Sequence, residues 1–187
     1  FGFVRIFPPP VTQEEVYPFV GRPLVSAVLD GINCAIICYG QTTAGKTHTM
    51  MGPVHRRTGI PTGMVTSSFI EPSVGLIPRM VQDIFRTSQL LPAHVKMTVR
   101  ASYIEIYVEQ VHDLIMPRYK PLKLRDFGDL CFTDAAEVPV TSASEVMAII
   151  GVGNSNRHVG KTAVSKASSR SHAILQLTVT TEDARSK

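Results

Sequence analysis

Residues 40–47 have the types and the spacing that phosphate binding requires. They fit the pattern GxxxxGK[ST] of the phosphate-binding loop, or P-loop. Its glycines let the backbone curl so that successive amide N–H groups face an anion. In such a loop the lysine reaches the β- and γ-phosphates of a nucleotide and the last hydroxyl binds Mg²⁺. The sequence therefore predicts a nucleotide-phosphate site formed by Gly40, Gln41, Thr42, Thr43, Ala44, Gly45, Lys46 and Thr47.

The segments on either side of the pattern favour the same interpretation. Residues 34–39 form a short apolar run, which predicts a buried strand entering the loop. Residues 47–50 can begin a helix, whose N-terminus adds partial positive charge toward a bound anion. The plainer alternative is a chance glycine-rich turn, and the strand before the loop and the helix after it make that alternative less frequent.

The type of nucleotide chemistry is less constrained. The Asn-Lys-x-Asp motif that a guanine-specific GTPase uses for base recognition is absent from the sequence. A Walker-B acidic residue would close a hydrophobic strand and hold the Mg²⁺ shell. Asp183 follows a segment that is too polar, and Asp113 follows one interrupted by Glu109 and Gln110. Neither aspartate is therefore a good Walker-B candidate.

A second group of residues could sense a γ-phosphate. Residues 168–172 read Ser-Ser-Arg-Ser-His and stand just before an apolar segment that predicts the last strand. A hydroxyl oxygen can bind Mg²⁺ or position water, and an arginine can form a bidentate pair with a carboxylate. Taken alone, a solvated serine-rich loop is the plainer interpretation of this segment.

Helical and strand patterns intermingle along the chain, which favours an α/β layer architecture. Apolar spacing and capping boxes predict helices over 12–31, 76–85 and 142–150, and Pro18 and Pro23 are expected to kink the first of them. The apolar patterns over 95–107 and 173–179 predict strands. Residues 53–75, rich in Gly and Pro, predict a long surface loop.

Composition excludes several classes of protein. The 187 residues are 44% hydrophobic and 18% charged, as in an average globular chain of one domain. The net charge of +4 permits an acidic partner without requiring one. Cys34, Cys38 and Cys131 include no CxxC pair, which argues against a disulfide scaffold or zinc module and favours a reducing compartment. No window is apolar enough to predict a membrane span.

The two motifs, in this order, resemble those of a kinesin motor domain. Residues 40–47 are similar to that family's P-loop, GQTxxGKT, and residues 168–172 to its switch I motif, SSRSH. Further matches lie at 12–17, 75–79, 103–114 and 155–159, so the resemblance covers about residues 1–179. It implies a P-loop NTPase fold of three layers, with a mixed central sheet and helices on both faces, and a partial motor domain spanning residues 1–187.

The resemblance implies a microtubule-based motor ATPase of the cytoplasm and cytoskeleton. ATP and Mg²⁺ would be its cofactors, and hydrolysis would be coupled to microtubule binding and movement. Residues 120–125 fall near the family's β-tubulin-facing hairpin. By position, Gln41 to Thr47 would wrap the phosphates, and His48 would lie against adenine. Thr47 and Ser169 would bind the metal. Ser168 and Ser169 would close on the γ-phosphate, and Arg170 would pair with a switch II carboxylate.

Some features depart from the family pattern. Ser165 and Val108 each stand where asparagine is usual, and both changes predict weaker ordering of the nucleotide loops. The resemblance also implies a first core strand before residue 1 and switch II, DLAGSE, after residue 187. The 187 residues alone are therefore expected not to complete hydrolysis.

Two other functions fit parts of the sequence. A non-catalytic, nucleotide-dependent microtubule-binding module is favoured by Ser165, by Val108 and by the expectation that half of the motor domain lies outside these residues. An unrelated P-loop nucleoside or nucleotide kinase would need a lid with an arginine cluster, for which Arg56 and Arg57 are the candidates. We expect no nucleic-acid partner, and any homodimer would form through segments outside these residues.

Overall fold

The computed structural model describes residues 2–55, 62–63, 70–127, 130–157 and 171–185. The chain divides into two compact units, which are described separately: unit 1 comprises residues 1–55 and 61–90, and unit 2 comprises residues 56–60 and 91–187. The elements in chain order are α1 (Gln13–Leu29), α2 (Lys46–Met51), α3 (Leu76–Ser88), β1 (Val95–Tyr107), β2 (Gln110–Asp113), β3 (Leu124–Phe127), β4 (Leu130–Thr133), β5 (Val138–Val140), α4 (Ala143–Asn156) and β6 (Ser171–Asp183).

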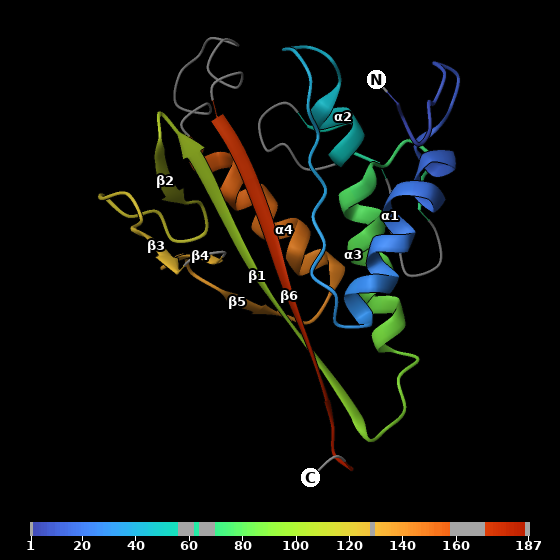
Figure 1. Ribbon diagram of the computed structural model, residues 1–187, viewed down its shortest axis with the longest axis vertical. Coiled ribbons are helices and arrows are strands. Elements are labelled where there is room, and N and C mark those ends of the chain that lie inside the picture. Colours follow the sequence, from blue (N-terminus) through green and yellow to red (C-terminus); the bar gives the residue numbers. More distant parts are fainter. Residues whose placement is uncertain (1, 56–61, 64–69, 128–129, 158–170, 186–187) are drawn as a thin grey trace. The chain divides into compact units, whose positions relative to one another are not determined.

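Unit 1 contains the three helices α1, α2 and α3, and α1 and α3 lie side by side (Figure 1). The predicted capping box begins α1: the Glu15 amide donates to Thr12 Oγ1, and the Thr12 amide donates to Glu15 Oε2 at 2.8 Å. The Tyr17 hydroxyl, on α1, donates to Asp83 Oδ2, on α3, at 2.6 Å. Burial, together with this hydrogen bond, raises the pKa of Tyr17 above its usual value.

The strand predicted over residues 34–39 is wrong. The segment has no regular secondary structure in the described part of the chain, and most of its side chains are exposed. Ile37 and Tyr39 are 87% and 97% exposed. Apolar composition alone does not make a strand, because each backbone N–H and C=O must pair with a neighbouring strand.

Unit 2 is built around β1. All thirteen residues of β1 pair antiparallel with β6, from Val95 opposite Asp183 to Tyr107 opposite Ser171. The other edge of β1 pairs with β5 and with β2, also antiparallel (Figure 1). The strands predicted over 95–107 and 173–179 are thus confirmed, and the second extends two residues earlier and four later.

Among the described residues of unit 2, the helix α4 packs on this sheet. α4 begins after Ser142, whose hydroxyl accepts the Glu145 amide as the capping motif predicts. Its buried Val146 and Ile150 join β1 residues in the core of unit 2. A Cβ on Gly153 would lie only 2.2 Å from a ring carbon of Tyr103, so the helix approaches β1 as closely as a glycine allows.

The turn between β1 and β2 contains one departure from the family pattern. Val108 and Glu109 connect the strands as a two-residue hairpin, and their φ angles are 49° and 59°. Two successive positive φ angles define a type I′ turn, for which Asn-Gly is the favoured pair. Val108 therefore occupies a strained hairpin position.

We predict that replacing Val108 by Asn and Glu109 by Gly stabilises the protein by about 1 kcal/mol, because these residues adopt left-handed backbone angles at lower cost. Urea unfolding measures the change in the free energy of unfolding. Val4→Asn is the matched control, since Val4 is a fully exposed valine without a positive φ. Equal or lower stability of the double variant would contradict the assignment of strain.

Candidate nucleotide site

The P-loop residues turn the chain sharply into α2. Gly40, Thr43 and Gly45 have φ angles of 153°, 71° and 90°, and α2 begins directly after Gly45. The helix predicted from residue 47 is thus confirmed, with a start one residue earlier. A positive φ is unusual for a β-branched residue such as Thr43. The loop therefore has the left-handed turns that a phosphate-wrapping backbone requires.

Lys46 places its charge over the beginning of the loop. Its Nζ donates to the carbonyl oxygens of Gly40 and Gln41, both at 2.7 Å. The side chains of Thr47 and His48, the next two residues of α2, are exposed. A cation and a hydroxyl thus follow one another at the start of a helix, as do the lysine and Ser/Thr of a P-loop, and the imidazole of His48 comes next.

Backbone contacts fix the far end of α2. A Cβ on Gly75 would lie 2.5 Å from the Gly52 nitrogen and 2.6 Å from two backbone atoms of Met51. Gly52 itself has a φ of 82°, and its amide donates to the His48 carbonyl at 2.7 Å. The residues that lead into α3 therefore touch the end of α2 backbone to backbone.

A buried arginine holds the same region from α3. Arg79 is 5% exposed, and its guanidinium donates to three carbonyl oxygens, those of Val74 at 2.8 Å and of Glu71 and Pro72 at 2.9 Å. Burial lowers the pKa of Arg79. This contact fixes residues 71–74 on the first turn of α3, which the sequence correctly predicted to begin at Leu76.

The second motif is described only in part. Ser168, Ser169 and Arg170 lie outside the described residues, as does Ser165, so their predicted roles stay predictions. Ser171 begins β6, and its hydroxyl accepts a hydrogen bond from Arg157 Nη2 at 2.8 Å.

Arg157 joins this residue to a buried carboxylate, because its Nε lies 3.4 Å from Glu105 Oε1 and Glu105 is fully buried. Three elements therefore meet at the guanidinium: the end of α4, the C-terminal end of β1 and the start of β6. The sequence matched 155–159 to the family but assigned Arg157 and Glu105 no role. The helix was predicted only over 142–150, so the sequence did not indicate that Arg157 directly follows its end.

Neither aspartate considered for Walker B fills that position. Asp113 is buried and accepts the amides of Ile115 and Met116 at 2.9 Å and of Ala136 at 2.7 Å, as a turn-forming carboxylate does. Asp183 accepts the Arg185 amide at 2.9 Å, and this bond lowers the pKa of Asp183. Within the described residues, no three His, Cys, Asp or Glu side chains gather as metal ligands.

We predict that Gly75→Ala destabilises the protein by about 2 kcal/mol, because the new methyl group meets backbone atoms that cannot turn aside. Thermal or urea unfolding measures the effect. Gly2→Ala is the control, since nothing lies within 4 Å of a Cβ at that position. An equally stable Gly75→Ala variant would show that the contact between α2 and residues 73–75 does not constrain the fold.

Comparisons with known proteins agree on one family. Residues 1–187 match the sequence profile of the kinesin motor domain. The chain is 39% identical over 187 residues to kinesin heavy chain of Strongylocentrotus purpuratus, covering 99% of this chain and 17% of that protein. It is 37% identical over 183 residues to Kinesin-like protein KIF27 of Homo sapiens, covering 96% of this chain and 12% of that protein.

A solved structure of a fast kinesin is also similar, with a TM-score of 0.83 and 33% sequence identity over 99% of this chain and 49% of that chain. The chain thus spans about half of that solved chain and less than a fifth of the length of the curated relatives it matches. None of the helices in the described ranges is long and apolar enough to cross a bilayer. The predicted resemblance and P-loop NTPase fold are confirmed: the chain belongs to the kinesin motor domain family.

Proposed function

We propose that this chain is part of a microtubule-based motor ATPase and that residues 1–187 belong to one motor domain. The observation that carries the proposal is the P-loop turn into α2, with Lys46 over the loop and Thr47 exposed beside it, in a member of the kinesin motor domain family. Bound ATP and Mg²⁺ supply the transferable phosphoryl group and the metal that neutralises its charge.

The residues of the loop fit this pair of cofactors. The backbone amides of residues 41–47 would face the phosphates, and Lys46 would exchange the carbonyl oxygens of Gly40 and Gln41 for phosphate oxygens. The Thr47 hydroxyl would bind Mg²⁺, and His48 would lie against adenine. We further propose that Ser168 and Ser169 would close on the γ-phosphate and that Ser169 would also bind the metal. Arg170 would pair with a switch II carboxylate.

A basic surface on unit 2 suits an acidic filament such as the microtubule. Lys120, Lys123 and Arg125 are exposed on the segment that leads through β3. Leu122 between them is buried, and its amide donates to the Val111 carbonyl at 2.7 Å. This segment is thus anchored to β2, and we propose that it faces tubulin. A cytoskeletal location follows from that partner, and homodimers would form through other segments.

We favour a catalytic motor over a non-catalytic microtubule-binding module because the chain belongs to the kinesin motor domain family. Val108, one reason for the second interpretation, lies in the turn between β1 and β2, and its effect on turnover stays a prediction. Ser165 stays untested. Because only a catalytic motor turns over ATP, a measurement of microtubule-stimulated ATP turnover decides between the two functions.

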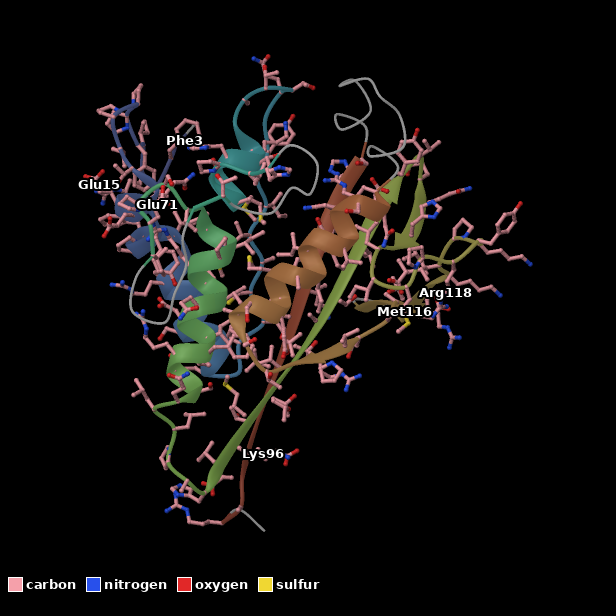
Figure 2. The ribbon with its side chains drawn as sticks, turned by 180° about the vertical axis from the view of Figure 1, so that it is seen from behind. Phe3, Glu15, Glu71, Lys96, Met116 and Arg118 are labelled. Atoms are coloured by element: carbon pink, nitrogen blue, oxygen red, sulfur yellow. The ribbon has the colours of Figure 1, made fainter. Side chains whose placement is uncertain are left out.

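We predict that Lys46→Ala lowers microtubule-stimulated ATP turnover of the full-length protein about 100-fold, because a cation aimed at the transferred phosphate is lost. Phosphate release with and without microtubules measures the effect. Lys96→Ala is the control, since Lys96 is an exposed lysine near the start of β1 (Figure 2). Lack of turnover in the unchanged protein, with ATP-sensitive microtubule binding, would support the non-catalytic module instead.

We also predict that the double variant Lys123→Glu and Arg125→Glu weakens microtubule binding roughly tenfold at low salt, since two attractions become repulsions. Cosedimentation in the absence of ATP measures the affinity. Lys96→Glu changes the charge elsewhere on unit 2 and should leave the affinity unchanged. Equal loss in both proteins would show that net charge matters and that the segment has no specific contact.

A further inference from the structure

One side chain connects the start of α1 to the P-loop helix. Gln13 is the first residue of α1 and is 9% exposed. Its Nε2 donates to the backbone carbonyl of His48, 35 residues later in the chain, at 2.5 Å. We propose that Gln13 is a positioning residue for nucleotide binding, because it fixes the orientation in which α2 presents Lys46, Thr47 and His48. This inference rests on the nucleotide site proposed above.

The contact is not needed to cap either helix. Thr12 and Glu15 already form the complete capping box of α1. The His48 carbonyl already accepts the Gly52 amide at 2.7 Å, so it would keep a partner without Gln13. The hydrogen bond from Gln13 therefore fixes the orientation of α2 relative to α1, and it is not needed to pair a backbone group that would otherwise lack a partner.

α2 depends on contacts from outside itself. It is six residues long, far shorter than an isolated helix needs to be stable in water. Its N-cap is Gly45, which has a φ of 90° and supplies no side-chain capping bond. Backbone contacts hold its end at Met51 and Gly52, so a second point is needed to fix its rotation. Gln13 supplies that point at His48, within one turn of Lys46.

Rotation of α2 would affect the proposed ligands directly. Lys46 and Thr47 immediately precede His48, and all three lie in the first turn of the helix. Displacements of about 1 Å in positioning groups can change binding and turnover by large factors. Loss of the Gln13 contact is therefore expected to weaken nucleotide binding while most of the fold is retained.

Nucleotide titration of variant full-length proteins tests the proposal. Gln13→Met keeps the length of the side chain and removes the donor; Gln13→Glu places an oxygen against the His48 carbonyl while its charge favours the N-terminus of α1. We expect the dissociation constant for a fluorescent ATP analogue with Mg²⁺ to rise about tenfold in Gln13→Met and further in Gln13→Glu. The melting temperature without nucleotide should stay nearly unchanged in both.

Two further variants make the outcomes distinguishable. Glu14→Met introduces the same side chain at an exposed position of the same turn and should bind as the unchanged protein does. Lys46→Ala should lose binding. If Gln13→Met binds normally while Lys46→Ala does not, or if its weaker binding comes with a matching fall in melting temperature, the positioning role is wrong. If Lys46→Ala binds as well as the unchanged protein, the nucleotide site itself is wrong and the inference falls with it.

Discussion

The backbone contact between Gly52 and Gly75 is the constraint on which the P-loop half of the chain depends. No side chain fits between these residues, because a Cβ on either glycine would meet backbone atoms at 2.5 Å. The contact joins the end of α2 to the start of α3, and the buried Arg79 holds the same segment by three carbonyls. A six-residue helix can thereby present a charged loop without a large core of its own.

In unit 2, a sheet positions a residue of the second motif. The continuous ladder between β1 and β6 fixes the position of Ser171, the fourth residue of the serine-rich motif. Arg157 then connects Ser171 to the buried Glu105, so the same residue is held by its backbone and by its side chain. In both units, a predicted phosphate-contacting motif is fixed at the point where it joins a helix or a strand: the P-loop at α2 and the serine-rich motif at β6.

Local patterns predicted most of the described elements, because their determinants lie within a few residues. The Thr12–Glu15 capping box, the alternation over 95–107 and the P-loop glycines are of this kind. Residues 34–39 were predicted wrongly, since a strand depends on neighbours that composition does not reveal. The contacts from Gln13 to His48 and from Asp113 to the Ala136 amide were missed for the same reason: each depends on distant backbone groups.

The most direct test of a nucleotide site at residues 40–48 is a crystal structure of the protein with ADP and Mg²⁺. The account predicts the diphosphate within hydrogen-bond distance of the amides of residues 41–47, with Lys46 Nζ turned from the Gly40 and Gln41 carbonyls onto phosphate and Thr47 Oγ1 beside the metal. Nucleotide bound elsewhere, with Lys46 still on those two carbonyls, would contradict it.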